Sequence, residues 1–268
     1  MATKAALEAL LRDRKLDRTL IGHLSAASAD EAGSPLALPA LDARLLGGLP
    51  RGQLSEIAGA ASTGRTSLAW AWLSAATRRG ESAALIDTFD RFDPASGAAA
   101  GIELTRLLWV RGQAISKTGA AVDPAWLPGV RMVSGPGTLV ERAVDRALKA
   151  LNLVLQAGVC TAVVLDLADV PLAGLRRIPA STWLRVQRLL EGGDAACVLL
   201  VPLPVARSAG GVTMLTGVSD ALAGGVRWAG SHDRARRLAG VSIAARLVSP
   251  RRTLCGDVGL EARVDPSI

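Results

Sequence analysis

The stretch EIAGAASTGRTSLAW, Glu56–Trp70, decides how the rest of the chain is interpreted. Its centre, Gly59–Thr66, reads GAASTGRT and follows the phosphate-loop pattern G-x-x-x-x-G-K-[ST], except that Arg65 replaces the lysine. An apolar segment, Leu54–Ala58, precedes the loop as a predicted strand, and the pattern of Thr66–Thr77 predicts a buried helix after it. Strand, glycine loop and helix in this order are the context that the pattern requires.

The residue types of this loop suit a bound phosphate. Gly59 and Gly64 let the backbone wrap around an anion, and the N–H groups of the loop and of the helix N-terminus supply positive potential. A hydroxyl such as that of Thr66 would hold Mg²⁺. The predicted nucleotide-binding residues are Gly59, Ser62, Thr63, Gly64, Arg65, Thr66, Ser67 and Asp166.

Asp166 enters this set through a second motif. TAVVLD, Thr161–Asp166, is an apolar strand pattern that ends in a carboxylate, where a phosphate-loop ATPase holds magnesium through water. We therefore predict Thr66 and Asp166 as the metal site, occupied only when ATP is bound with Mg²⁺. The two motifs lie about 100 residues apart, which is typical of adjacent strands in such folds. The alternative is a glycine-rich turn together with a solvated aspartate at a strand end.

Arg65 changes the chemistry expected of the loop. Lysine carries a compact ammonium on a flexible stem, whereas the arginine guanidinium is longer, planar and wider. Arg65 keeps the charge, so a nucleotide could still bind, but its charge is displaced from the position of the lysine. Phosphoryl transfer depends on positioning, so the displacement is costly.

The remaining pattern alternates strands with helices. Strands are predicted at Ser82–Asp87, Arg106–Val110 and Ala196–Val201, and helices at Thr138–Gln156 and Ser181–Leu190. The strands are continuous apolar runs, which is typical of parallel sheets covered on both faces. After Gly211, GGVRWAG and GVSIAARLV predict antiparallel strands. The predicted fold class is α/β, with a mostly parallel central sheet, helices on both faces and antiparallel strands near the C-terminus.

Three segments are predicted. Residues 1–37 form an N-terminal helix and a linker arm, 38–252 form the core domain, and 253–268 form a C-terminal strand or tail. Leu7, Leu10 and Leu11 share one face of the first helix, Thr3–Arg14, so we expect it to support self-association by docking on a neighbouring molecule.

Composition favours an acidic partner. The net charge is +7, and half of the residues are apolar, enough for a sizeable core. Only four of the 31 basic residues are lysine, so a GC-rich genome is an alternative source of the arginine excess. The sequence holds neither a signal-peptide pattern nor an uncharged apolar run of 18 residues, so we expect a cytoplasmic protein without membrane contact.

From Leu38 to about Arg251 the chain resembles the core of the bacterial RecA recombinase. LPALDARLLGGLPRGQLSEIAGAASTGRTSL is similar to the lead-in and phosphate loop of that family, and AALIDTFDRFDP to its next strand. AVVLDLAD and CVLLVPLPVARSAGG resemble its magnesium-binding strand and the following strand with its DNA loop. The resemblance implies a RecA-like core.

The departures from RecA concern catalysis. The glutamate that positions the attacking water in RecA falls on Phe89, which can neither orient nor deprotonate water. Asp90 and Asp93 lie nearby, but a shift of one residue along a strand turns a side chain to the other face. The chain is also expected to lack the C-terminal domain of RecA. We therefore predict no catalytic residue and, at most, a degenerate ATPase.

A shortened, arginine-rich RecA-like chain with eroded nucleotide motifs is identified as a member of the ImuA family. The resemblance implies a cytoplasmic, SOS-induced accessory factor that acts with ImuB and an error-prone polymerase in translesion synthesis. It also implies contact with RecA through protomer-type surfaces. The alternatives are an active ATPase that depends on single-stranded DNA and a regulator similar to a cell-division inhibitor.

Two loops are candidates for contact with single-stranded DNA. The resemblance places DNA loops after Asp166 and after Val201, and these loops carry Arg176, Arg177 and Arg207. Arginines on flexible loops neutralise phosphates without reading sequence. The alternative, given equal weight, is a pair of solvated basic loops.

Overall fold

The computed structural model describes residues 33–113, 139–206, 210–217, 225–230, 237–248 and 256–263. The predicted helix at residues 3–14, Thr138 and Arg207 lie outside these ranges. The compact unit that carries the sheet begins at Gly33.

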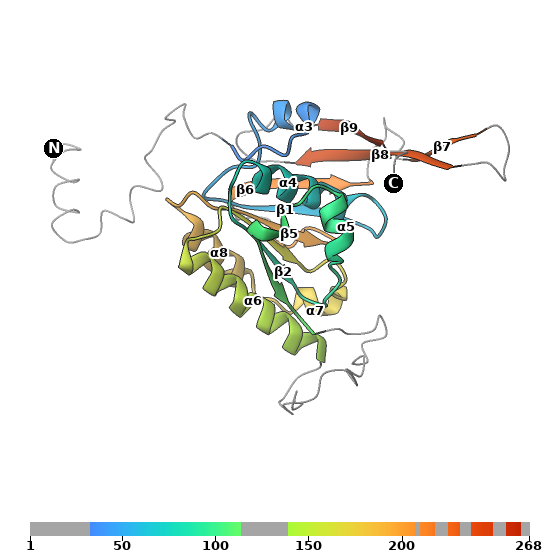
Figure 1. The fold of residues 1–268 in the computed structure, drawn as a ribbon. Helices are drawn as coiled ribbons and strands as arrows, with labels where there is room; N and C mark the ends of the chain where they lie inside the picture. Colours follow the sequence, from blue (N-terminus) through green and yellow to red (C-terminus); the bar gives the residue numbers. More distant parts are fainter. Residues whose placement is uncertain are drawn as a thin grey trace, which may run out of the picture. The chain divides into compact units, whose positions relative to one another are not determined.

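A nine-stranded sheet forms the centre of this unit (Figure 1), in the order β3-β2-β4-β5-β1-β6-β8-β7, with β9 paired to β8. Pairs from β3 through β6 are parallel, and β8 runs antiparallel to β6, β7 and β9. This mixed sheet confirms the predicted fold class. The strands are β1 (Leu54–Gly59), β2 (Ala83–Asp87), β3 (Leu107–Arg111), β4 (Ala162–Asp166), β5 (Ala196–Val201), β6 (Gly210–Thr216), β7 (Gly225–Ala229), β8 (Arg237–Val248) and β9 (Gly256–Arg263).

Helices cover both faces of the sheet. They are α3 (Pro39–Arg44), α4 (Arg65–Arg78), α5 (Pro94–Ala99), α6 (Leu139–Ala157), α7 (Leu172–Arg176), α8 (Ala180–Leu190) and the 3₁₀-helix η1 (Leu104–Arg106). Among the described helices, none is both long enough and apolar enough to span a bilayer.

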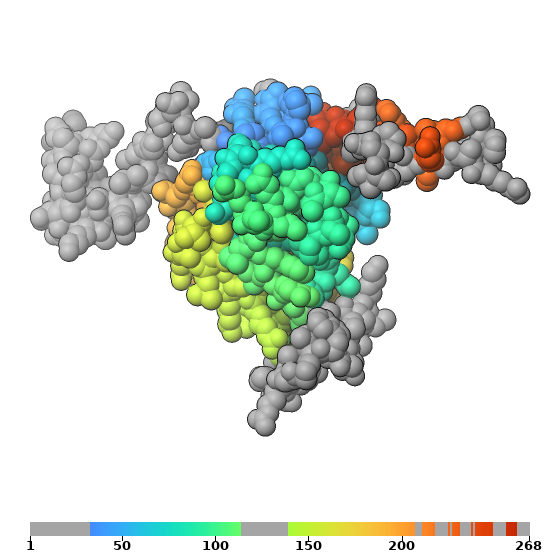
Figure 2. Space-filling model, in the orientation of Figure 1, coloured from blue at the N-terminus to red at the C-terminus, as the bar shows by residue number. Residues whose placement is uncertain are grey.

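The strands are buried on both sides because successive side chains point to opposite faces. In β2, Ala84 and Ile86 pack in the core under α6, α7 and α8, whereas Ala83 and Leu85 pack in the core under α3 and α4. Figure 2 shows the residues of α4 (teal) and α5 (green) and those of α6 (yellow-green) on the surface of the described unit.

One prediction about topology is wrong. β1 and β4 are not adjacent, because β5 lies between them and pairs with both. Each crossover helix can carry the chain past one strand position or two, so the number of intervening residues does not determine strand order. In addition, the sequence patterns did not predict β6, which runs parallel to β1.

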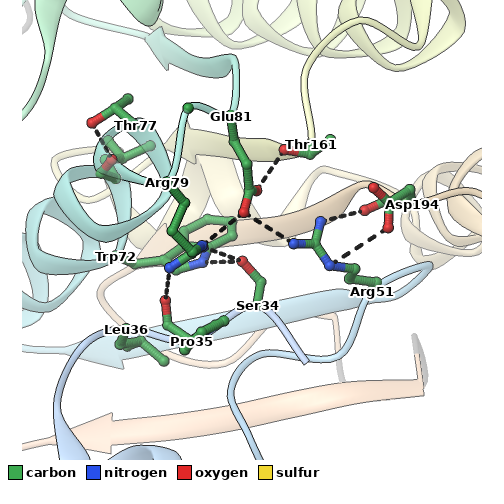
Figure 3. A network of polar contacts seen from close by, with 12 residues as sticks. Ser34, Pro35, Leu36, Arg51, Trp72, Thr77, Arg79, Glu81, Thr161 and Asp194 are labelled. Carbon is green, nitrogen blue, oxygen red and sulfur yellow. Dashed lines mark hydrogen bonds and ion pairs between the residues drawn. The ribbon is translucent and has the colours of Figure 1, made fainter. Parts of the chain in front are cut away.

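Glu81 organises the edge of the sheet at which the parallel strands begin (Figure 3). Its carboxylate accepts hydrogen bonds from Thr161 Oγ1 at 2.7 Å, Arg79 Nε at 2.8 Å and Arg51 Nη2 at 3.2 Å. Arg51 also donates to the carbonyl of Asp194 at 2.9 Å. Four of these residues lie just before four different strands: Arg51 before β1, Glu81 before β2, Thr161 before β4 and Asp194 before β5. The network therefore fixes the relative positions of these strands.

The same network holds the first described residues. Ser34 exchanges backbone hydrogen bonds with Leu49, at 2.7 and 2.8 Å. Its hydroxyl accepts from Trp72 Nε1 at 2.9 Å, and Arg79 Nη1 donates to the carbonyl of Pro35 at 2.9 Å (Figure 3). The segment that enters the core is therefore attached to α4 through polar contacts as well as through the buried Leu36.

Candidate nucleotide site

The loop between β1 and α4 has the backbone of a phosphate loop. Ser62 and Gly64 adopt left-handed φ angles of 63° and 91°. A Cβ on Gly59 would lie 2.1 Å from Thr216 Oγ1, and one on Gly64 would lie 2.6 Å from Ile243 Cδ1. Both glycines are therefore required by the approach of strands β6 and β8. The loop thus retains the shape that can bind an anion.

Thr63 ties the loop to β6. Its hydroxyl lies 2.8 Å from the carbonyl of Ala60 and 2.6 Å from the hydroxyl of Thr216. Ser62 and Ser67 are exposed, and Thr66 is half-buried in the first turn of α4. The loop residues predicted from the sequence are thus brought together, with Thr63 directed at β6.

Arg65 does not extend into free space above the loop. Its guanidinium is 7% exposed and donates through Nη1 to the carbonyl of Gly59. Through Nη2 it donates to the carbonyl of Ala168 at 3.0 Å, just beyond the end of β4. The side chain therefore joins the start of the phosphate loop to the loop that follows β4, and both contacts use donors that a bound phosphate would need.

Asp166 ends β4 as predicted, and its carboxylate accepts a hydrogen bond from the backbone N–H of Ala168 at 2.9 Å. The pKa of Asp166 is raised to about 6, mainly by burial and also by the negative charges of Asp87 and Asp169. The Ala168 hydrogen bond and the charge of Arg65 oppose this shift in the pKa. Without a nearby cation, this environment therefore favours the protonated carboxyl more than water does.

Asp169 links the two sides of the site. Its Oδ1 lies 3.7 Å from Arg65 Nη2, and its Oδ2 lies 3.5 Å from Arg91 Nε. Arg91 lies in the connection between β2 and α5. Asp169 and Arg91 are each about 40% exposed, so this bridge between α4 and that connection is weak.

Asp87 shapes the same connection. It is 1% exposed, and its carboxylate accepts from the backbone N–H groups of Arg91 at 2.9 Å and Phe92 at 2.8 Å. Trp109 Nε1 also lies 3.3 Å from Asp87 Oδ2. Asp87 stands opposite Asp166 in the β2–β4 pairing, but its oxygens are committed to the backbone of its own loop.

Phe89 is the residue that the sequence predicts at the position of the RecA glutamate. Phe89 is 6% exposed and packs in the core under α6 to α8. Asp90 pairs with Arg111 through both carboxylate oxygens, at 2.8 and 2.7 Å. Asp93 caps α5 by accepting from the backbone N–H of Ser96 at 2.9 Å. Each carboxylate of this segment thus has a structural contact of its own.

These residues fit an anion better than they fit hydrolysis of Mg·ATP. The loop could hold phosphate through its backbone, and Thr66 and Asp166 could hold Mg²⁺ together with the phosphates of a nucleotide. Among the described residues, no three His, Cys, Asp or Glu side chains form a group that could hold a metal by themselves. None of Phe89, Asp90 and Asp93 is placed to position a water. We therefore derive no hydrolytic step for this site.

The candidate DNA loops are described in part. Arg176 is exposed at the end of α7, and Arg177 forms an ion pair with Glu141 of α6. Arg207 lies outside the described residues, but the two residues before it are anchored. Glu56 Oε1 accepts from the backbone N–H of Val205 at 2.9 Å and from that of Ala206.

Glu56, Asp87, Arg91 and Asp169 were not predicted to be site residues. A charged residue within the apolar strand LSEIAG could have indicated that Glu56 has a buried partner. Asp87 ends a buried strand as Asp166 does, which is the same signal. Arg91 and Asp169 carry no such signal, because they meet only after the strands are ordered.

Known proteins are similar to the part of the chain that carries the loop. The family model for the RecA N-terminal domain matches residues 23–118. The RecA protein of Lactobacillus delbrueckii subsp. bulgaricus is 34% identical over 109 residues, which cover 39% of this chain and 33% of that protein. RecA of Roseiflexus sp. is 39% identical over 100 residues, 36% of this chain and 28% of that protein.

A plant protein gives a similar match. The chloroplastic DNA repair protein recA homolog 1 of Arabidopsis thaliana is 40% identical over 68 residues, 25% of this chain and 16% of that protein. The matched segments thus span a third or less of the length of these curated relatives. Residues 23–118 are thus similar to the RecA N-terminal domain, and the mixed α/β sheet is consistent with a RecA-like core.

Proposed function

We propose that this RecA-like protein is a non-catalytic or weakly catalytic accessory factor of damage-induced, error-prone translesion synthesis. In this role it acts in the cytoplasm as an ImuA-type adaptor. It binds ImuB and its polymerase, or RecA, or both. The observation that carries the proposal is the position of Arg65, whose guanidinium is bonded to the carbonyls of Gly59 and Ala168.

An arginine held in this way supports the loop without a nucleotide. A buried guanidinium stays protonated, so its charge must remain paired or hydrogen-bonded. Moving it toward a β- or γ-phosphate would leave two carbonyls without their donors, which costs about 1 kcal/mol or more for each. A nucleotide would have to repay this cost before it gained any affinity.

Phe89 supports the same proposal from the catalytic side. Phe89 is buried under α6 to α8. This residue of the connection after β2 therefore packs in the core and offers no group that could act as a base. An adaptor needs the RecA-like frame and its surfaces but not turnover. Similarity to RecA further supports RecA and single-stranded DNA as partners, with Arg176, Arg177 and Arg207 as DNA contacts.

The decisive test measures nucleotide binding and hydrolysis for the wild type, Arg65→Lys, Phe89→Glu and the double variant. We expect the wild type to show no hydrolysis above that of a sample without protein, with and without single-stranded DNA. Arg65→Lys is expected to tighten ATP binding by about tenfold or more, because lysine leaves the carbonyl contacts more readily. Phe89→Glu alone is expected to change ATP binding little.

Turnover in the wild type that rises with single-stranded DNA and disappears in Asp166→Ala would overturn the non-catalytic role. It would establish the second candidate, a DNA-dependent ATPase, which the preserved loop backbone at Ser62 and Gly64 favours. Thermal melting of each variant separates a lost site from a lost fold. The adaptor role has its own measurement, namely co-purification of the full chain with ImuB or RecA.

A further inference from the structure

The outer face of α8 is a surface that the nucleotide site does not use. The inner face of this helix is fixed by the buried residues Trp183, Val186 and Leu190. Gln187 adds two hydrogen bonds to the chain before β1, accepting from the N–H of Leu54 at 2.9 Å and donating to the carbonyl of Gly52 at 3.1 Å. The rotation of α8 about its axis is therefore determined.

This rotation places arginines along the centre of the outer face and a leucine on each side. At 3.6 residues per turn, Arg185 and Arg188 point away from the core, between Leu184 and Leu189. Both arginines are exposed, and the two leucines are 46% and 37% exposed. α6 packs beside α8 in the same layer (Figure 1) and adds Leu153, which is 67% exposed.

The segment that contains α7 and α8 is rich in arginine and lacks acidic residues. Val170–Leu190 contains four arginines and neither Asp nor Glu. Within the described part of the chain, no ion pair joins Arg176, Arg185 or Arg188 to a carboxylate. Ion pairs do satisfy most other basic side chains of that part, namely Arg51, Arg65, Arg79, Arg91, Arg106, Arg111, Lys149, Arg177, Arg227 and Arg246.

We infer that the outer face of α8, formed by Leu184, Arg185, Arg188 and Leu189, binds an acidic amphipathic helix of a partner protein. Arginine is enriched at protein interfaces, and its planar guanidinium matches the geometry of a carboxylate. Leucines beside it bury apolar surface when a second helix packs across the first. Charge complementarity and the leucine pair thus select the same occupant.

Nucleic acid fits this face less well. A basic patch that binds phosphates gains nothing from two half-exposed leucines, and single-strand sites use aromatic side chains on which bases stack. The only aromatic residue of α8, Trp183, is 3% exposed and lies on the inner face. The exposed apolar residues therefore distinguish a protein partner from DNA.

This inference rests on the proposed adaptor role, because an adaptor needs a contact that is separate from its nucleotide site. The surface can nevertheless be tested alone. The probe is a fluorescein-labelled synthetic helix of about 18 residues, or five turns, with leucines along one stripe and glutamates beside it. A peptide of the same composition in scrambled order is its partner control. Fluorescence anisotropy with the full-length protein measures both affinities.

We expect the wild type to bind the amphipathic helix at least tenfold more tightly than the scrambled peptide. Arg185→Glu/Arg188→Glu should weaken this binding by about tenfold or more, and Leu184→Ser should weaken it less. The matched control is Arg78→Glu/Arg106→Glu, which reverses two exposed arginines away from α8 and should leave the affinity unchanged. If Arg185→Glu/Arg188→Glu has a lower melting temperature than the wild type, the neutral variant Arg185→Gln/Arg188→Gln replaces it.

Equal binding of the two peptides, or equal loss in the α8 and control variants, would overturn the inference. So would a thymidine oligonucleotide whose binding falls in the α8 variant while peptide binding is unchanged, because the face would then bind nucleic acid. These results are distinguishable from failure of the proposed function. An active ATPase that still binds the peptide through α8 would overturn only the non-catalytic role.

Discussion

The two ends of α4 carry arginine networks that resemble each other in chemistry and differ in strength. At the first residue, Arg65 bonds two carbonyls and approaches the carboxylate of Asp169. Just after the last residue, Arg79 bonds the carbonyl of Pro35 and the carboxylate of Glu81 (Figure 3). Each arginine joins α4 to a segment distant in the sequence.

The carboxylates explain the difference. Glu81 is 17% exposed and receives hydrogen bonds at 2.7 to 3.2 Å, whereas Asp169 is 40% exposed and its closest cationic nitrogens are 3.5 and 3.7 Å away. The network around Glu81 is therefore part of what holds the sheet together. The network around Arg65 lies at the candidate nucleotide site, beyond the ends of β1 and β4, and only its carbonyl contacts are short. Variants at each end can test this contrast.

Glu81→Ala is expected to have the largest effect, a loss of about 3 kcal/mol in the free energy of unfolding at pH 7. Three donors from Arg51, Arg79 and Thr161 would lose their acceptor in a half-buried place. Urea unfolding followed by tryptophan fluorescence measures the change. Glu103→Ala is the matched control, because that glutamate pairs with Arg106 at the surface.

The loss should depend on pH in a defined direction. Burial alone would raise the pKa of Glu81, but hydrogen bonds from Thr161 and Arg79 and the charges of Arg51 and Arg79 hold it below the ordinary 4.5. A lowered pKa stabilises the folded state above pH 4.5, and this contribution is lost as the pH falls further. The difference between wild type and Glu81→Ala should therefore shrink below pH 4.5. A difference that stays constant would contradict the network.

Asp166→Asn is expected to stabilise the protein by about 2 kcal/mol at pH 7.5. Burial raises the pKa of Asp166 from 3.8 to about 6, so keeping the carboxylate ionised at pH 7.5 costs folding energy. In the wild type this loss of folding free energy is absent below pH 3.8 and complete above about pH 6. Thermal melting at pH 4 and pH 7.5 should show the gain only at the higher pH. Destabilisation at pH 7.5 would indicate that the ionised form has a partner.

Arg65→Lys is expected to lower the free energy of unfolding by about 1 kcal/mol in the absence of nucleotide. A lysine ammonium keeps the charge but cannot span both carbonyls, those of Gly59 and Ala168, with a planar fork. Arg78→Lys, on the exposed side of the same helix, is the control. A variant as stable as the wild type would show that the arginine does not brace the loop.

The sequence predicted the loop that contains Arg65 but not the network around Glu81. Gly59 and Gly64 belong to a local pattern whose spacing carries the backbone requirement, so the loop could be recognised without a structure. Apolar runs at β1, β2, β4 and β5 indicated buried parallel strands for the same reason. These features depend on neighbours in the sequence.

The rest depends on strand order, which no local pattern encodes. β5 lies between β1 and β4, and only that arrangement decides which residues meet Arg65. The contacts of Arg65 with Ala168 and Asp169 span more than 100 residues, and those of Glu81 with Thr161 span 80. In the same way, the absence of a catalytic role for Phe89 stays a prediction from its residue type, and its packing under α6 to α8 had no signal in the sequence.

Asp169→Asn is expected to have the smallest effect, below about 0.5 kcal/mol at low salt and less at high salt. Its two ion pairs are long and half-exposed, so solvent already screens most of their energy. The variant nevertheless separates the two parts of the Arg65 network, because the carbonyl contacts of the guanidinium remain. Urea unfolding of Asp169→Asn, Arg65→Gln and the double variant forms a double-mutant cycle, because glutamine removes the charge that lysine would keep. A coupling energy near zero would show that the carbonyl contacts with Gly59 and Ala168, and not the ion pair, stabilise the loop. A coupling energy above about 1 kcal/mol would show that the ion pair is as strong as the contacts of Glu81. The contrast between the two ends of α4 would then disappear.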